Sequence, residues 1–221
     1  MQQLLADRRL LQDVNFRDEV GHMPLHNAVV NNNDRVVLHL LGDPRVEINC
    51  RDKNGATPLH MAADIGLDQM VQILLANKRV EINSGDNNGW TPLLAPAAND
   101  RARVVQILLQ DQHVDVNCRI NENIPRNSHG SNFARAKLYE RATPLHLAAQ
   151  FNFAEVVQLL LADPRTEANC KNKMGDTPLM HHVKTAHVQN SVPILRLLLN
   201  HSSVDLYTTD EEGNGLKEVA R

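Results

Sequence analysis

The chain has 221 residues, of which 42% are hydrophobic and 22% charged, and its formal net charge is −3 at pH 7. Acidic and basic residues are interspersed without a long basic run, which argues against nucleic acid as a partner. No apolar stretch approaches the roughly 20 residues that span a bilayer, which argues against a membrane. The sequence holds one Trp, two Tyr and four Phe, so Leu, Val, Ile and Ala must fill the core.

Residues 1–20 are typical of an incomplete repeating unit. Gln2 to Leu11 has the pattern of a helix, and Asp13-Val14-Asn15 and a turn from Asp18 to Gly21 follow it. Four charged residues interrupt the opening segment: Asp7, Arg8, Arg9 and Asp13. A signal peptide needs an unbroken apolar region, so we expect none here.

A four-residue pattern then recurs along the chain. Its copies are Met23-Pro24-Leu25-His26, Thr57-Pro58-Leu59-His60, Thr91-Pro92-Leu93-Leu94, Thr143-Pro144-Leu145-His146 and Thr177-Pro178-Leu179-Met180. The intervals between them are 34, 34, 52 and 34 residues, so the third interval is one period with 18 extra residues. An apolar block such as Met70-Val71 with Leu74-Leu75 follows each of the first four copies at the same distance, and it follows the fifth copy four residues later. A fixed period of this length is the signature of a repeat architecture.

Each unit predicts two short helices. Thr can cap a helix with its hydroxyl, and Pro fits the first helical position. Gly66 and the equivalent Asn152 can end the first helix in a left-handed conformation, and the apolar block has the spacing of a second helix buried along one side. An Asp-x-x-Gly turn leads to the next unit. Neither helix can bury its apolar side alone, so neighbouring units must stack.

The clearest copy is the run Asp52-Lys53-Asn54-Gly55-Ala56-Thr57-Pro58-Leu59-His60-Met61-Ala62-Ala63. It resembles the ankyrin repeat, and the resemblance covers nearly the whole chain in five copies. The resemblance implies an all-α ankyrin-repeat solenoid of about five helix-turn-helix repeats, with hairpin loops at right angles to the helices. It also implies that partner proteins bind to the loop tips and the concave first-helix face.

We therefore expect one ankyrin-repeat domain over residues 1–221. Its expected units are an N-terminal partial repeat at 1–20, repeats at 21–54, 55–88, 89–140, 141–174 and 175–212, and a C-terminal partial repeat at 213–221. Gly215 stands where the pattern has Thr, and no Pro follows it. The incomplete ends indicate either shortened caps or, as we prefer, a domain cut from a longer protein.

Unit three departs from the pattern. Leu94 replaces the expected His, and Pro96 stands where unit two has Ala62. A Pro inside a helix removes a hydrogen bond and costs up to about 3 kcal/mol, so this helix should be kinked or begin late. Unit five carries four extra residues between its helices, around 186–191.

The 18 extra residues lie within the segment 119–141, at the tip of the third hairpin. It holds five basic residues and two aromatic ones: Arg119, Arg126, Arg135, Lys137, Arg141, Phe133 and Tyr139. One interpretation is a partner-specific contact. The other is a disordered loop, or one whose rings merely pack on the neighbouring repeats. The sequence leaves both open.

Cys50, Cys118 and Cys170 occupy the same position in their units. Equivalent positions in stacked repeats lie on the order of 10 Å apart, which exceeds the roughly 7 Å Cα separation of a disulfide. Reduced thiols and the lack of a secretion signal predict an intracellular protein, cytoplasmic or nuclear.

Histidines and loop charges give no sign of catalysis. The resemblance implies that His26, His60 and His146 tie neighbouring loops together by hydrogen bonds. Three further histidines have no zinc-site spacing: His181, His182 and His187. The nucleophile elbow, the phosphate loop and the metalloprotease helix are all absent. We predict no catalytic residues, metal or cofactor.

Four asparagines each follow an acidic residue and a hydrophobic one: Asn49, Asn83, Asn117 and Asn169. The pattern is similar to the ankyrin sequence that the cellular asparaginyl hydroxylase recognises, which gives a secondary hypothesis of hydroxylation. The alternative is that these side chains shape the turn by hydrogen bonds. Ala168 departs from the preferred Val or Ile, so Asn169 is the weakest of the four.

The predicted function is non-catalytic protein binding by a monomer acting as a scaffold, adaptor or targeting module. The candidate contact residues are Trp90, Arg119, Phe133, Arg135 and Tyr139 around the insertion, and Met61, Ile65, Gln150 and Phe151 on the first-helix face. Ile65 and Phe151 have the alternative of partial burial between helices. The alternative functions are the recognition arm of a larger enzyme or pathogen effector and, as above, a hydroxylase substrate.

Overall fold

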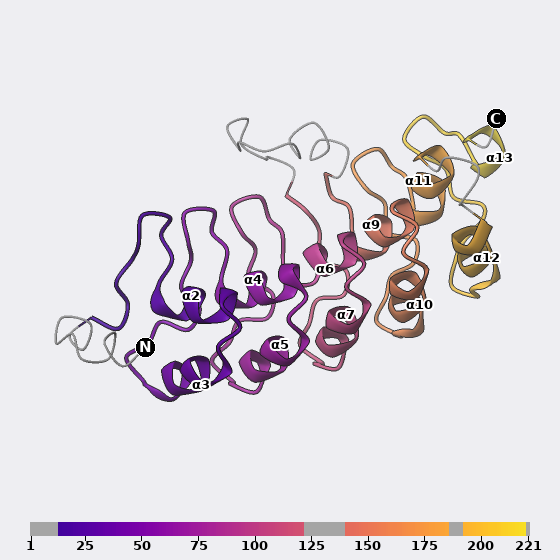
Figure 1. Cartoon of the computed structure of the whole chain (residues 1–221). Coiled ribbons are helices and arrows are strands. Elements are labelled where there is room, and N and C mark those ends of the chain that lie inside the picture. The colour runs from indigo at the N-terminus through magenta and orange to yellow at the C-terminus, as the bar shows by residue number, and fades with distance from the viewer. Residues whose placement is uncertain (1–12, 122–139, 186–191, 220–221) are drawn as a thin grey trace.

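The computed structural model describes residues 13–121, 140–185 and 192–219. Over these ranges the chain forms a row of helix pairs in two layers, with hairpin loops projecting from the side of the first-helix layer (Figure 1). The only β-structure within these ranges is an isolated bridge between Thr209 and Gly215. The predicted all-α solenoid of about five repeats is confirmed.

The two layers differ in their place within each repeat. The first-helix layer consists of α2 (Pro24–Val30), α4 (Pro58–Ile65), α6 (Leu94–Ala98), α9 (Pro144–Gln150), α11 (Pro178–Thr185) and α13 (Leu216–Val219). The second-helix layer consists of α3 (Asp34–Gly42), α5 (Asp68–Leu75), α7 (Ala102–Leu109), α10 (Ala154–Ala162) and α12 (Val192–Asn200). Each helix contacts the equivalent helices of the adjacent repeats, and the two helices of each pair contact one another.

The core runs between the layers from one repeat to the next. Leu59, Met70, Leu108 and Leu160 are among its most deeply buried side chains. Among the described residues no Phe, Tyr or Trp is classed as buried. The prediction of a core made from aliphatic side chains is thus confirmed, and the core is continuous because each repeat covers its neighbour.

The local signals of the sequence act as expected in the second repeat. Pro58 occupies the first turn of α4, and Thr57 Oγ1 accepts a hydrogen bond from the His60 backbone N–H at 3.4 Å. Gly66 ends the helix with φ +87°, and Asn152 has φ +62° just after α9. At the hairpin, one Asp52 carboxylate oxygen accepts the backbone N–H of Asn54 at 2.9 Å and that of Ala56 at 2.7 Å.

The first helix of the third repeat begins late. α6 begins at Leu94, whereas α4 begins at Pro58, which is equivalent to Pro92. Pro96 has no N–H to donate to the carbonyl of Pro92, so the first turn cannot close there. The sequence predicted a helix that is kinked or begins late, and the late start is the alternative that is confirmed.

The two ends of the insertion lie next to each other on the stack of repeats. The Ile120 N–H donates to the Ala142 carbonyl at 3.2 Å, and the Arg141 N–H donates to the Ile120 carbonyl at 3.1 Å. The helices on either side, α6 and α9, remain in contact. Phe133, Arg135 and Tyr139 lie outside the described residues, as do the expected helix at residues 2–11 and the extra segment at 186–191. No helix in the described part of the chain is long and apolar enough to cross a bilayer.

Candidate protein-binding surface

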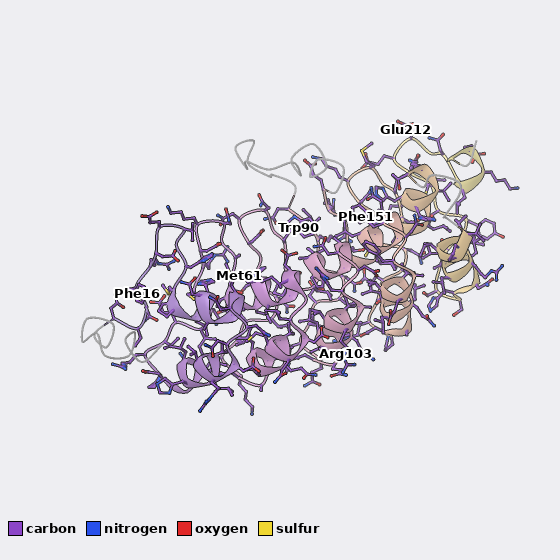
Figure 2. All side chains as sticks on the ribbon, viewed as in Figure 1. Phe16, Met61, Trp90, Arg103, Phe151 and Glu212 are labelled. Atoms are coloured by element: carbon purple, nitrogen blue, oxygen red, sulfur yellow. The ribbon has the colours of Figure 1, made fainter. Side chains whose placement is uncertain are left out.

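The first helices present one repeating face, which we call the furrow face. Its residues lie at i, i+3 and i+4 of each helix, and this spacing places side chains on one side of a helix. They are Asn27, Val30 and Asn31; Met61, Asp64 and Ile65; Ala95, Ala98 and Asn99; Leu147, Gln150 and Phe151; and His181, Lys184 and Thr185. Figure 2 shows Met61 and Phe151 along the first-helix layer with Trp90 near the hairpins, whereas Arg103 lies on the opposite side.

Hydrogen bonds join this face across neighbouring repeats. Asn99 Nδ2 donates to Asp64 Oδ1 at 2.8 Å. His181 Nε2 lies 2.9 Å from Gln150 Oε1. Equivalent positions of successive helices therefore lie close together, although Leu147 and His181 of this face are buried.

Exposure along the furrow face is uneven. Ile65 is 42% exposed and Val30 is 45% exposed, although both are large apolar side chains. Met61 and Phe151 are half-buried against the core, and Phe151 stacks on Phe153 with ring centroids 5.8 Å apart. The alternative of partial burial therefore holds for Phe151, whereas Ile65 faces outward. The Gln150 side chain also forms a hydrogen bond within the fold, to His181.

Trp90 and Arg119 lie at the hairpins, and both form hydrogen bonds within the fold. The backbone of Trp90 is fixed on both sides, because its N–H donates to Asp86 at 2.9 Å and its carbonyl lies 2.9 Å from His60 Nε2. Its indole is half-buried. Arg119 donates to the Lys171 carbonyl at 3.2 Å and to Cys170 Sγ at 3.4 Å. Arg119 therefore also bridges two repeats.

Three histidines connect successive hairpins. The Nε2 atoms of His26, His60 and His146 lie 3.0, 2.9 and 2.9 Å from the carbonyls of Ala56, Trp90 and Asp176. Each Nδ1 accepts a backbone N–H three residues earlier, so Nε2 carries the proton and donates it. The implied hydrogen-bonding role of these histidines is confirmed. We call this series of hydrogen bonds the histidine ladder. It is interrupted in repeats three and five, where Leu94 and Met180 replace the histidine.

Burial lowers the pKa of all three histidines, and that of His146 falls to about 3. The folded chain therefore keeps them neutral, whereas the unfolded chain binds their protons below a pKa near 6.5. Because the unfolded state binds more protons in that window, the free energy of unfolding should fall as the pH drops from 7 towards 3. Urea unfolding at a series of pH values measures this. His146→Leu should flatten the profile, and an equally steep profile in the variant would refute the assignment.

The cysteines offer no reactive thiol. Burial raises the pKa of Cys50 and of Cys118 to about 12 and also raises that of Cys170. All three are free and buried. A nucleophile must be deprotonated near neutral pH, so these thiols are structural. Within the described residues no three His, Cys, Asp or Glu side chains are grouped to hold a metal.

The hairpin asparagines form a second ladder. Each Nδ2 donates to a carbonyl of the following repeat, at Asn15, Asn49, Asn83, Asn117 and Asn169. Each Oδ1 accepts a backbone N–H from that same repeat. Both polar groups of each side chain are therefore bonded in the fold. Asn15 was not among the four predicted asparagines, although it follows the same Asp-Val pair as Asn117. Hydroxylation of Asn49, Asn83, Asn117 and Asn169 stays a prediction.

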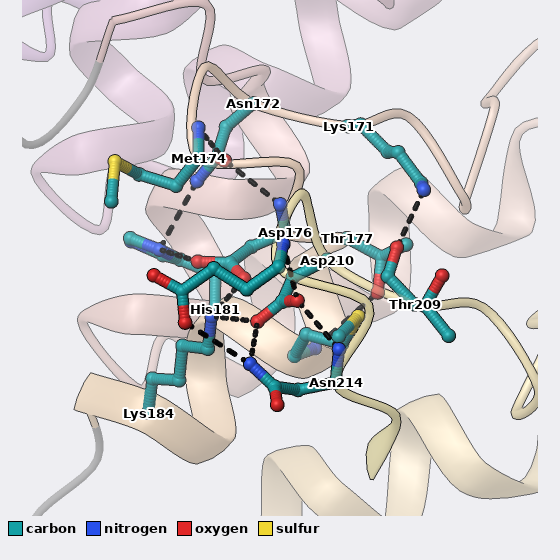
Figure 3. Close-up of polar contacts among 12 residues, drawn as sticks. Lys171, Asn172, Met174, Asp176, Thr177, His181, Lys184, Thr209, Asp210 and Asn214 are labelled. Atoms are coloured by element: carbon teal, nitrogen blue, oxygen red, sulfur yellow. Dashed lines mark hydrogen bonds and ion pairs between the residues drawn. The ribbon is translucent and has the colours of Figure 1, made fainter. Parts of the chain in front are cut away.

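Lys184 forms a charged cluster that sequence analysis did not find (Figure 3). Its Nζ lies 2.5 Å from Asp176 Oδ1 and 2.9 Å from Asp210 Oδ2. The hydrogen bond from Lys184 holds the pKa of Asp210 well below its usual range. Burial opposes ionisation of Asp176, but hydrogen bonds from His181 and Lys184 outweigh burial and lower its pKa. The cluster therefore joins the hairpin before α11 to the terminal partial repeat.

Lys184→Met should loosen that terminal repeat, because two carboxylates would face each other without a cation. We expect backbone amides in residues 205–219 to exchange with deuterium roughly tenfold faster. Lys78→Met, at an exposed lysine with no ion pair among the described residues, is the control. Unchanged exchange in residues 205–219 would show that the cluster does not secure this end.

Comparison with known proteins agrees with this arrangement. The family model described as ankyrin repeats (3 copies) matches residues 25–120 and 124–214. The chain belongs to the ankyrin-repeat family. Ankyrin-repeat domains generally act as protein–protein interaction modules, and the match is to no catalytic family.

Individual ankyrin-repeat relatives are more distant. Rabankyrin-5 of Mus musculus is 34% identical over 91 residues, which is 41% of this chain but only 7% of that protein. The crystal structure of the ankyrin-repeat domain of Bcl-3, described as a unique member of the IkappaB family, has a TM-score of 0.80 at 19% identity over 100% of this chain and 87% of that one. The ankyrin-repeat protein EF0377 has a TM-score of 0.74 at 22% identity over 92% of both chains. The two structures establish a shared fold.

Proposed function

We propose that this chain binds a partner protein without catalysis, through the furrow face and the hairpin tips, as a scaffold, adaptor or targeting module. The observation that supports the proposal most is the exposure of apolar side chains on a rigid face. Ile65 and Val30 are 42% and 45% exposed on helices whose ends are fixed by the capping and ladder hydrogen bonds. The solenoid therefore leaves a large part of each of these side chains uncovered.

A rigid, weakly charged face suits a protein partner. The buried centre of a protein interface is depleted in charge and enriched in aromatic and Met side chains, as Met61, Trp90 and Phe151 would supply. A specific interface buries on the order of 1,600 Å² in total, with a few residues providing most of the binding energy. The side chains are held in place beforehand, so binding orders little further structure.

The chain could serve as the recognition arm of a larger protein. Rabankyrin-5 is much longer than the segment it shares with this chain. In such a protein the same face would hold the target while a separate part acts on it. Binding by the furrow face is common to both arrangements.

Photo-cross-linking tests the proposal. A photoreactive benzoylphenylalanine placed at Asn31 or Asn99, which are exposed on the furrow face, should capture discrete partner proteins in cells. The same group at Arg103 or Gln72, which are exposed on the second-helix layer, should capture few. Equal capture from both layers, or capture from the second layer alone, would contradict the proposal.

A further inference from the structure

The furrow face is almost free of charged side chains. Its members include only two Asp, Glu, Lys or Arg residues, Asp64 and Lys184. Lys184 is already held between Asp176 and Asp210 at 2.5 and 2.9 Å. The charge available to a partner on this face is therefore that of Asp64.

No cation of the described residues forms an ion pair with Asp64. Each of their ion pairs joins other residues, so no Lys, Arg or His nitrogen lies within 4.0 Å of its carboxylate. Its one described side-chain hydrogen bond comes from Asn99 Nδ2 to Oδ1 at 2.8 Å. That bond orients the carboxylate and leaves Oδ2 for an incoming donor.

Apolar side chains surround this carboxylate on its own helix. Met61 lies one turn before it, and Ile65, which is 42% exposed, follows it directly. Val30, 45% exposed, occupies the same position of α2 that Asp64 occupies in α4. A partner that covers these apolar groups must also cover Asp64, and burying a carboxylate without a matched cation is costly.

We infer that the furrow selects a partner protein segment that presents apolar side chains with one lysine or arginine among them, and that Asp64 receives this cation. The inference rests on the proposed function and adds the chemistry of the partner to it. The apolar side chains cover Met61, Ile65 and Val30, and the cation fixes the register of the segment. An acidic segment is rejected, because like charges brought together in a desolvated interface are unfavourable.

Selection from a displayed library of random twelve-residue peptides tests this inference on the full chain. We expect the selected peptides to be rich in apolar residues and to carry Lys or Arg. Their affinity should fall about tenfold or more for Asp64→Asn, which keeps the shape and removes the charge. Selection on Asp64→Lys should instead yield peptides carrying Asp or Glu.

Matched variants separate this inference from the proposed function. Glu47→Lys changes an exposed acid outside the furrow face and should leave binding unaltered. Thermal unfolding of each variant checks that it is folded. Suppose that the peptides lose binding to the Ile65→Glu variant but bind the Asp64→Asn and Asp64→Lys variants with the same affinity as the unchanged chain. That result would overturn the inference and leave the proposed function standing. Peptides indifferent to Ile65→Glu and Met61→Glu would overturn both.

A second copy of the chain is the other occupant that the experiment can reveal. Sedimentation of the chain alone should show a monomer. A dimer that Ile65→Glu dissociates would mean that the chain covers its own furrow, and it would overturn the inference.

Discussion

Replacing Gly55 by alanine should lower the free energy of unfolding by about 3 kcal/mol, because the new side chain meets both strain and a clash. Gly55 has φ +80°, a left-handed conformation that disfavours any side chain. A Cβ there would lie 2.4 Å from Asn87 Oδ1 and 2.7 Å from the Asn87 backbone N. The hairpin before α4 and the hairpin before α6 are therefore packed against each other at a point that only glycine fits. Urea unfolding measures the loss.

Gly66→Ala is the matched control for this prediction. Gly66 has a similar φ of +87°, but the nearest atoms to its added Cβ belong to the flexible Arg101 side chain. We expect a cost of about 1 kcal/mol from the backbone conformation alone. Equal losses for the two variants would mean that the close approach of the hairpins contributes nothing to stability.

Leu160→Ala should destabilise the chain by about 3–4 kcal/mol, because it opens a cavity between stacked repeats. Leu160 is fully buried on α10, and α10 contacts α7, α9 and α12. The cavity would therefore open in a helix that packs against both neighbouring repeats. The same urea experiment gives the value.

Leu38→Ala is the comparison for Leu160, since Leu38 is 57% exposed on α3. The area it buries is small, so we expect a loss below about 1 kcal/mol. A Leu160 variant as stable as the Leu38 variant would be inconsistent with a core built by stacking.

The sequence predicted the elements that depend on local chemistry. The Thr-Pro helix starts, the left-handed ends at Gly66 and Asn152 and the late start of α6 at Leu94 all follow from side-chain properties within one repeat. The histidine ladder was predicted from the resemblance of the recurring motif to the ankyrin repeat. These features can be predicted without knowing which side chains the neighbouring repeat presents.

Some of the unpredicted interactions join residues that do not recur from repeat to repeat. Lys184 bridges Asp176 and Asp210, which are eight and 26 residues away, and neither acid's equivalents in other repeats meet a lysine in this way. Gln150 and Phe151 look free on a single helix, yet His181 and Phe153 engage them. Arg119 lies in the insertion by sequence but bonds to the Lys171 carbonyl of the next repeat, as Arg17 bonds to the Arg51 carbonyl. Stacking decides these contacts.

Hydrogen–deuterium exchange on a captured complex tests the central claim most directly. Once cross-linking at Asn31 has identified a partner, exchange of this chain should be measured with and without it. We predict slower exchange in residues 27–31, 61–65 and 95–99, with little change in 34–42, 68–75 and 102–109. Protection confined to the second-helix layer would contradict the account, because the partner would then bind the face opposite the furrow.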